Sequence, residues 1–119
     1  MKSDALRGHL EGLLLATLDG AKLHGYAIIE ALQLRSGGAL DLPTGTVYPA
    51  LRRLEAARLV ASEWSTVGGR QRRTYHLTER GRLALAAERA EWRRFAATIE
   101  GVLSPPDLTA AGVTAAAPG

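Results

Sequence analysis

Apolar residues recur at intervals of three and four over the first 18 positions, which is the period of a helix with one buried face. We therefore predict a helix over residues 4–18, ended by Asp19-Gly20. Its buried stripe is expected to consist of Leu6, Leu10, Leu13, Leu14 and Leu18. A second helix is predicted over residues 24–34, and Ser36-Gly37-Gly38 breaks it. The side chains expected to face inward from it are Tyr26, Ala27, Ile29, Ala31 and Leu34.

A third helix is predicted to begin at Pro43-Thr44 and to run to about residue 57. Val47, Leu51 and Leu54 share its buried side, so the arginines between them fall elsewhere on its surface. The alternating segment 39–42 ahead of this helix is too short to assign.

Beyond residue 58 the pattern alternates at every second position, which is typical of strands. Residues 59–65 and 73–78 are the predicted strands, and residues 66–71 form the tip of a hairpin. Gly68-Gly69 supplies the positive φ that a tight turn needs. Because a strand rather than a helix follows these glycines, they do not form a phosphate-binding P-loop.

Thr78-Glu79 marks the start of a long last helix, because the hydroxyl can cap free amides and the acid suits the positive end of the helix dipole. This helix is predicted over residues 79–103, and Pro105-Pro106 stops it. Residues 104–119 are rich in Ala, Gly, Thr and Pro, and we expect a disordered tail there.

The composition excludes several classes of protein. A chain of 119 residues with 46% hydrophobic content fits one folded domain, and its scarcity of aromatic residues favours a mainly helical core of Leu and Ala. Without cysteine there is no disulfide scaffold, thiolate zinc site or thiol nucleophile. The three histidines share no ligand spacing, and no nucleophile elbow or HExxH string occurs. We therefore expect no enzyme, no metal and no cofactor.

The longest apolar run, residues 13–18, is too short to span a bilayer, and the beginning of the chain lacks the layout of a signal peptide. A cytoplasmic protein without a membrane partner is expected.

Positive charge is concentrated in one part of the chain. Residues 43–82 hold eight Arg against three Glu, or +5, although the whole chain carries only +3. Arginine pairs bidentately with phosphates and guanine edges, so this cluster indicates a polyanionic partner.

Three helices, a two-stranded hairpin and a further helix follow the order of a winged helix-turn-helix, whose third helix enters a DNA groove. The basic cluster falls on that third helix and on the hairpin. We expect a mainly α protein with a small β-hairpin wing: a DNA-binding domain over residues 1–78 and one long C-terminal dimerisation helix over residues 79–103.

Three strings carry a family resemblance: HGY over residues 24–26, GTVYPALRRLE over residues 45–55, and GR at residues 69–70 leading to YHLTERG over residues 75–81. They resemble the PadR-type transcriptional regulators of the subfamily with a short C-terminal region. The resemblance implies a dimeric winged-helix repressor that dimerises through its last helix. The family usually has Gly where this chain has Arg58, which must then adopt a left-handed backbone or end the helix differently. It often has a pair of aromatics at Thr74-Tyr75.

The residues expected to contact double-stranded DNA lie on the third helix and the hairpin: Thr44, Thr46, Tyr48, Arg52, Arg53, Arg70, Arg72 and Arg73. Both threonines can cap the helix as well as bind a phosphate. Tyr48 is either a core aromatic with a surface hydroxyl or a phosphate ligand.

An apolar seam is expected along the last helix at Leu85, Trp92, Phe95, Ala96, Ile99 and Leu103. This seam is predicted to form a homodimer together with the first helix, the alternative being that the seam packs onto the first helix of its own chain. At Trp92 and its symmetry mate it can hold a small aromatic effector, the alternative being packed dimer core without a cavity.

These patterns together predict a homodimeric, sequence-specific regulator of transcription, a repressor that binds an inverted-repeat operator and is released by a small aromatic ligand. The alternative is a winged-helix module for protein–protein interaction without specific DNA readout. RNA binding is disfavoured by the lack of an exposed aromatic platform.

Overall fold

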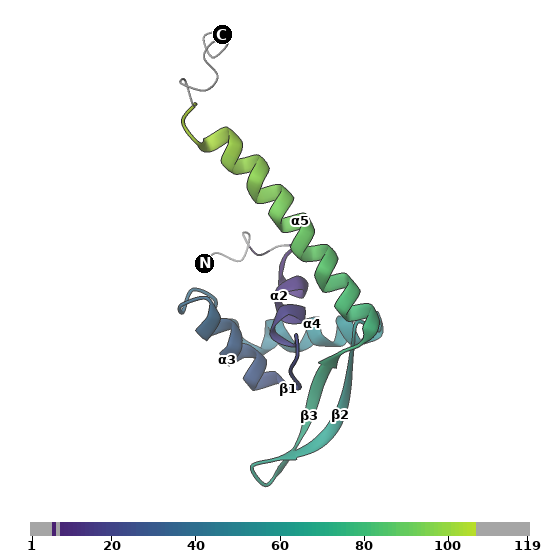
Figure 1. The fold of residues 1–119 in the computed structure, drawn as a ribbon. Helices are drawn as coiled ribbons and strands as arrows, with labels where there is room; N and C mark the ends of the chain where they lie inside the picture. The colour runs from purple at the N-terminus through teal and green to yellow at the C-terminus, as the bar shows by residue number, and fades with distance from the viewer. Residues whose placement is uncertain (1–5, 7, 107–119) are drawn as a thin grey trace. The chain divides into compact units, whose positions relative to one another are not determined.

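The structure, a computed structural model, describes Leu6 and residues 8–106 (Figure 1). Its elements follow the order α2 (Leu10–Thr17), β1 (Leu23–His24), α3 (Gly25–Arg35), α4 (Thr44–Ala56), β2 (Val60–Val67), β3 (Arg70–Leu77) and α5 (Glu79–Leu103). The chain divides into two compact units, Met1–Glu88 and Arg89–Gly119, so the first turns of α5 belong to the first unit. Most of the predicted tail, residues 107–119, lies outside the described residues. No helix in the described part of the chain could cross a membrane.

Aliphatic side chains from α2, α3 and α4 form the core of the first unit. Those that are almost completely buried are Leu14, Leu18, Ile28, Val47, Leu51, Leu54 and Val60. The predicted buried sides of the first and third helices are confirmed. The predicted inward face of α3 is wrong at Tyr26 and Leu34, which are exposed. Ile29 does pack against the core, but the buried hydrophobic residues of α3 are Ile28 and Leu32. These two residues lie one turn apart on a different face of the helix.

Helix α2 is shorter than the pattern predicts. It begins at Leu10, after Gly8, whose φ of +84° is incompatible with a right-handed helix. The predicted start of this helix lies outside the described residues. Its end is close to the prediction, with Leu18 as the C-cap just before Asp19-Gly20.

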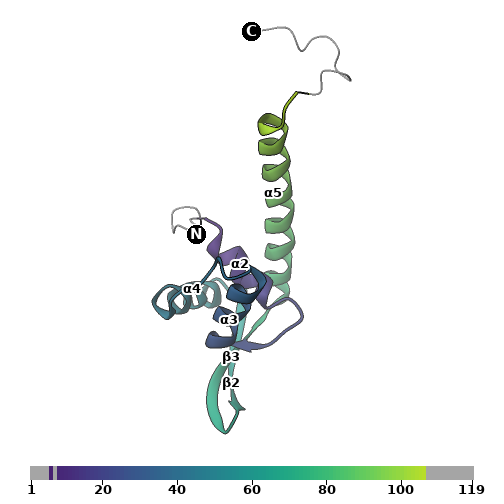
Figure 2. The same ribbon diagram turned by 90° about the vertical axis from the view of Figure 1, so that its left-hand side faces the viewer.

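The sheet has three antiparallel strands in the order β1-β3-β2, where the sequence predicted a two-stranded hairpin. The additional strand, β1, is only two residues long and pairs Leu23 with Tyr75 and His24 with Thr74. So short a strand shows no alternation in the sequence. Figures 1 and 2 show the β2–β3 hairpin, the wing, extending beyond α2, α3 and α4.

The turn of the wing is tighter than predicted. Only Gly68 and Gly69 form it, both with positive φ (58° and 79°), as in the two-residue turns that suit twisted hairpins. The strands therefore reach further toward the tip, and Arg70 and Arg72 belong to β3 together with Arg73, which the sequence pattern already predicts to lie in a strand. On a strand, neighbouring side chains point to opposite faces, so Arg72 and Arg73 have different surroundings.

Helix α4 ends in a left-handed residue that is not glycine. Arg58 has a φ of 63°, its N–H donates to the Glu55 carbonyl at 2.9 Å, and the Leu59 N–H donates to the Leu54 carbonyl at 2.9 Å. This is the Schellman arrangement, in which glycine is the favoured residue. Of the two outcomes expected at this position, the chain adopts the left-handed one.

Arg58→Gly is expected to raise the free energy of unfolding by about 1 kcal/mol, because glycine adopts a positive φ without the steric cost of a Cβ. Urea denaturation measures the change. Arg58→Ala is the matched control: it removes the same charged side chain but keeps the Cβ, and it should stay within about 0.5 kcal/mol of wild type. Equal stability of the two variants would contradict the assignment of strain to this residue.

Helix α5 begins where Thr78-Glu79 predicts. The Gly81 N–H donates to the Thr78 hydroxyl at 3.0 Å, which caps the helix. Thr78 also holds the preceding turn, because its own N–H donates to the Leu59 carbonyl at 3.1 Å. The start of α5 is thereby fixed against the junction between α4 and the wing.

Candidate nucleic-acid interface

One side of α4 presents small residues and an arginine. Gly45, Pro49, Arg52 and Ala56 recur at spacings of four, three and four, on the side opposite the buried Val47. Arg52 is exposed and makes no hydrogen bond or ion pair with the described residues. The small neighbours leave room for a partner to approach this side of the helix closely, beside the exposed Arg52.

The N-terminus of α4 is open. Its N-cap is Pro43, which makes no side-chain cap, so the expectation that Thr44 or Thr46 caps this helix is wrong. Proline sets the extended entry but has no side-chain acceptor for the first-turn amides. Both threonines are exposed beside those amides. Free helix amides together with exposed hydroxyls suit an anion such as phosphate.

Arg53 lies on another flank of α4 and differs from Arg52. Its Nε donates to the Glu11 carboxylate of α2 at 3.0 Å, and both side chains remain about half exposed. This ion pair offsets the charge of Arg53 and turns it toward α2.

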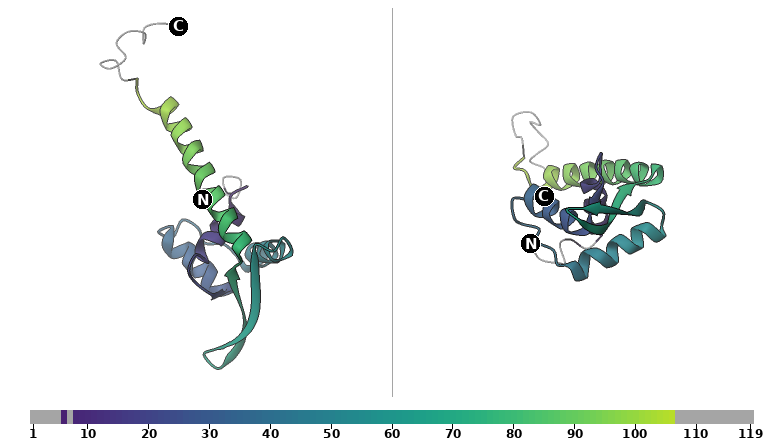
Figure 3. Two further views of the ribbon diagram at one scale, coloured as in Figure 1. Left: turned by 45° about the vertical axis from the view of Figure 1, so that its right-hand side comes forward. Right: turned by 90° about the horizontal axis from the view of Figure 1, so that it is seen from below.

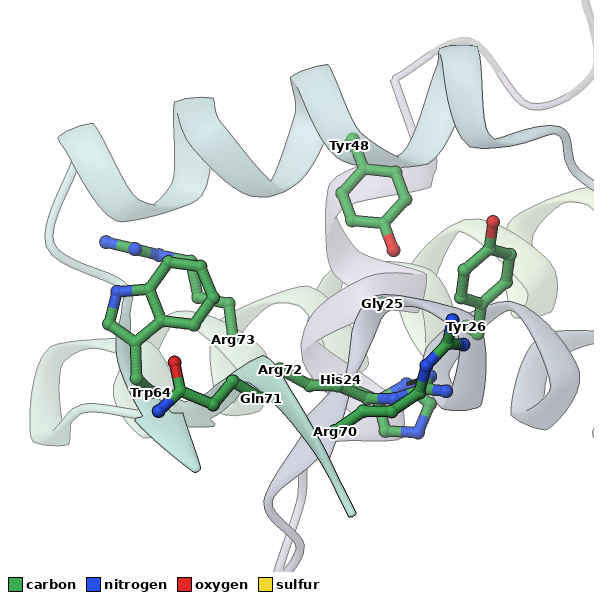
Figure 4. Close-up of a pocket in the computed structure, with 9 residues that line it drawn as sticks. All are labelled: His24, Gly25, Tyr26, Tyr48, Trp64, Arg70, Gln71, Arg72 and Arg73. Atoms are coloured by element: carbon green, nitrogen blue, oxygen red, sulfur yellow. Dashed lines mark hydrogen bonds between the residues drawn. The ribbon is translucent and has the colours of Figure 1, made fainter. Parts of the chain in front are cut away.

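A groove separates α4 from the wing (Figure 4). It has a volume of about 400 Å³ and is lined by the start of α3, by Tyr48 of α4 and by residues of both strands of the wing. Seen from below, α4 lies along one side of the hairpin (Figure 3). Four predicted site residues line the groove, namely Tyr48, Arg70, Arg72 and Arg73. Thr44, Thr46, Arg52 and Arg53 do not line it.

Five lining residues were not assigned from the sequence: His24, Gly25, Tyr26, Trp64 and Gln71. The first three form the HGY string, which supported the resemblance but was not assigned to the DNA-binding site. His24 reaches the groove because β1 pairs with β3 and so places His24 beside the wing.

Arg72 is held by an imidazole. Its Nη1 lies 3.4 Å from Nδ1 of His24, and the same Nδ1 accepts the Ala27 N–H at 3.3 Å, capping α3. The partner that Arg72 meets is therefore an imidazole rather than a carboxylate.

Arg73 is held by uncharged groups. Its Nε donates to the Ser62 hydroxyl at 2.9 Å, and its guanidinium carbon lies 5.2 Å from the centre of the Trp64 ring. By contrast, Lys22 pairs with Glu63. The arginines that line the groove thus have no carboxylate in direct contact among the described residues, and their positive charge is left for an external anion.

Tyr48 provides a hydroxyl donor at the groove. Its ring meets that of Tyr26 edge-on, with centroids 6.4 Å apart. A Cβ on Gly25 would overlap the Tyr48 hydroxyl, so only glycine leaves room for the tyrosine here. Burial raises the pKa of Tyr48 above its usual value, and the neighbouring Tyr26 adds to the shift. The hydroxyl therefore keeps its proton at neutral pH and can donate a hydrogen bond to an anion.

The second unit carries the predicted apolar seam. Trp92 and Phe95 are each 52% exposed and lie with ring centroids 5.7 Å apart. Ile99 and Leu103 are exposed as well, and Ala96 is partly buried. The prediction that Leu85 belongs to this seam is wrong. Leu85 is 3% exposed and lies in the core of the first unit, because the first turns of α5 pack there. The exposed part of the seam begins at Trp92.

The helix pair α3–α4 followed by the β2–β3 wing defines a winged helix-turn-helix protein. The model of the transcriptional regulator PadR-like family matches residues 14–87. The chain belongs to this family, whose members are transcriptional regulators rather than enzymes. It is similar to transcriptional regulator Rv3488 of Mycobacterium tuberculosis, with 46% identity over 80 residues that cover 67% of this chain and 72% of that protein.

Solved structures support the fold. A PadR family transcription regulator from Clostridium difficile is 30% identical with a TM-score of 0.72, and the match covers 82% of this chain and all of that one. Bacillus subtilis PadR, solved in complex with operator DNA, is 22% identical with a TM-score of 0.61. That match covers 67% of this chain and 46% of the Bacillus protein.

Proposed function

We propose that this chain is a cytoplasmic, homodimeric repressor that binds an inverted-repeat operator in double-stranded DNA. The observation that carries the proposal is the groove between α4 and the wing, where Arg72 and Arg73 are held by partners other than carboxylates. Arginines without a carboxylate in direct contact, beside an exposed helix, suit a polyanion. Bacillus subtilis PadR, which shares the fold, was solved on operator DNA, and this supports the same class of ligand here.

The described residues divide into two roles on this account. Arg52 is the candidate for reading base edges, because it is unpaired on the exposed side of α4. The residues proposed to bind phosphates are Thr44, Thr46, Tyr48, Arg53, Arg70, Arg72 and Arg73. The open N-terminus of α4 adds backbone amides to the phosphate contacts.

Arg52→Ala is expected to weaken operator binding by about 1–3 kcal/mol and to relax the preference at one base position. Arg53→Ala should have a smaller effect and weaken all sequences alike, because Arg53 pairs with Glu11. Titration of the preferred duplex and its single-base variants distinguishes these effects. Arg94→Ala, on α5, controls for the loss of one charge. Unchanged binding by both α4 variants would place the recognition surface elsewhere.

A module that binds another protein through α4 is the alternative. The two functions differ in their response to salt, because DNA binding releases counterions and a largely apolar protein interface does not. Fluorescence anisotropy with a labelled duplex at about 50 to 200 mM salt should show affinity falling steeply, by orders of magnitude. Affinity for DNA that is weak and insensitive to salt would favour the protein-binding alternative.

The homodimer is proposed to form through α5. Trp92, Phe95, Ala96, Ile99 and Leu103 give the second unit an apolar surface that a second copy can cover. A two-fold dimer presents two α4 helices to an inverted repeat. Analytical ultracentrifugation is expected to give a dimer for wild type and a weaker one for Ile99→Asp. A wild-type monomer with full DNA affinity would contradict the proposal.

A small aromatic effector is proposed to bind between Trp92 and its symmetry mate. A ligand there releases DNA only if it binds the unbound arrangement of the dimer more tightly. The test is to titrate planar aromatic compounds into the protein and to follow tryptophan fluorescence and operator binding together. The control is Trp92→Ala, which retains Trp64. If no compound quenches Trp92 or releases DNA, and the variant only dissociates, then Trp92 is a dimer anchor without a ligand pocket.

A further inference from the structure

Arg73 is fixed more firmly than the other arginines of the wing. It stands directly opposite Trp64 in the β2–β3 register, and its guanidinium lies over the indole ring (Figure 4). Its Nε is used by the hydroxyl of Ser62, two residues from Trp64 on the same face of β2. Stacking and hydrogen bond together fix the plane of the guanidinium.

Ser62 also connects the wing to α4. Its hydroxyl donates to Oε2 of Glu55 at 2.6 Å while its oxygen accepts from Nε of Arg73 at 2.9 Å. A hydroxyl that donates to a carboxylate becomes a stronger acceptor, so the two hydrogen bonds reinforce each other. The chain of contacts runs from α4 through one serine to the wing arginine.

This arrangement leaves the terminal nitrogens of Arg73 available. Nε and the face of the guanidinium are occupied, whereas Nη1 and Nη2 make no hydrogen bond or ion pair with the described residues. An arginine whose plane is already fixed loses less side-chain entropy when it binds, and its two terminal N–H groups match a phosphate.

We propose that Ser62 and Trp64 are positioning residues that orient Arg73 toward one phosphate of the DNA backbone. Glu55 anchors this unit to α4, so that the wing contact keeps its register with the contacts of the helix. The inference rests on the proposed function, since it names how one arginine of that interface is held. Neither Ser62 nor Trp64 needs to touch a base.

The experiment measures operator affinity and its salt slope for Arg73→Ala, Ser62→Ala and Trp64→Leu. Each variant is expected to lose about fivefold or more in affinity and to lower the slope by up to about 0.9, the value for one phosphate. Ser62→Ala combined with Arg73→Ala should add little to Arg73→Ala alone, because both act through one contact. Ser62→Thr and Trp64→Phe keep the hydroxyl and the ring face and should restore most of the affinity.

Ser65→Ala is the matched control. It removes a serine hydroxyl from the same strand, where Ser65 hydrogen-bonds Thr74 on the opposite face. Its affinity and salt slope should equal those of wild type. If Arg73→Ala weakens binding while Ser62→Ala and Trp64→Leu do not, the positioning role is refuted and DNA binding stands. Unchanged binding by Arg73→Ala refutes it too. A wild-type protein without salt-dependent DNA affinity refutes the proposed function itself.

Discussion

Gly81→Ala is expected to unfold more than about 10 °C below wild type, which corresponds to a loss of about 3 kcal/mol in the free energy of unfolding. A Cβ at this position would collide with the carbonyl oxygen of Leu59 and lie 3.0 Å from its carbonyl carbon. The obstacle is backbone, and that carbonyl already accepts the Thr78 N–H. Neither group can move without separating α5 from the junction of α4 and the wing.

Gly101→Ala is the matched control in the same helix. A Cβ there meets nothing within 4 Å, and alanine favours the helix over glycine, so stability should rise by up to about 1 kcal/mol. Thermal unfolding of both variants, followed by circular dichroism, measures the contrast. If the Gly81→Ala variant is as stable as Gly101→Ala, then α5 does not approach the Leu59 carbonyl closely enough to require glycine.

The triple variant Arg70→Ala, Arg72→Ala and Arg73→Ala is expected to lose about a hundredfold in operator affinity at moderate salt. Each phosphate contact removed lowers the log–log salt slope by about 0.9, so the slope should fall by up to about 2.7. The free energy of unfolding should change by less than about 1 kcal/mol, because Arg70 and Arg73 are exposed and Arg72 is only partly buried.

A second triple variant controls for net charge. Changing Arg82, Arg93 and Arg94 of α5 to alanine removes the same three charges at exposed positions outside the proposed interface. Its salt slope should stay close to that of wild type. If the wing variant instead unfolds or dissociates while its salt slope is unchanged, the wing arginines are structural.

The long elements could be predicted because their determinants are local. The apolar spacing from Val47 to Leu54, together with Pro43-Thr44, predicts a helix whose bounds agree with α4 to within a residue or so at each end. The Thr78-Glu79 cap and the following prolines predict α5. Strand β1 could not be predicted in this way, since its two residues become a strand only by pairing with Tyr75 and Thr74, about 50 positions further along the chain.

The groove was only partly predictable. Its arginines follow from the charge pattern, but the roles of His24 and Trp64 depend on contacts between distant segments. Trp64 had a usable signal: a two-residue turn at Gly68-Gly69 fixes the register and places Trp64 opposite Arg73. The sequence interpretation used a longer tip and so lost this register. The need for glycine at position 81 could not be predicted from its neighbours in the sequence either. It arises from the Leu59 carbonyl, which belongs to another part of the chain.

Selection of bound sequences from a random pool of double-stranded DNA tests the central claim most directly. The full-length protein is expected to enrich an inverted repeat whose half-sites are separated by one helical turn, about 34–36 Å, because two α4 helices related by a two-fold axis enter successive major grooves. Arg52→Ala should enrich the same repeat with one base position relaxed. A pool that remains random, or a single asymmetric site bound by a monomer, would contradict the account.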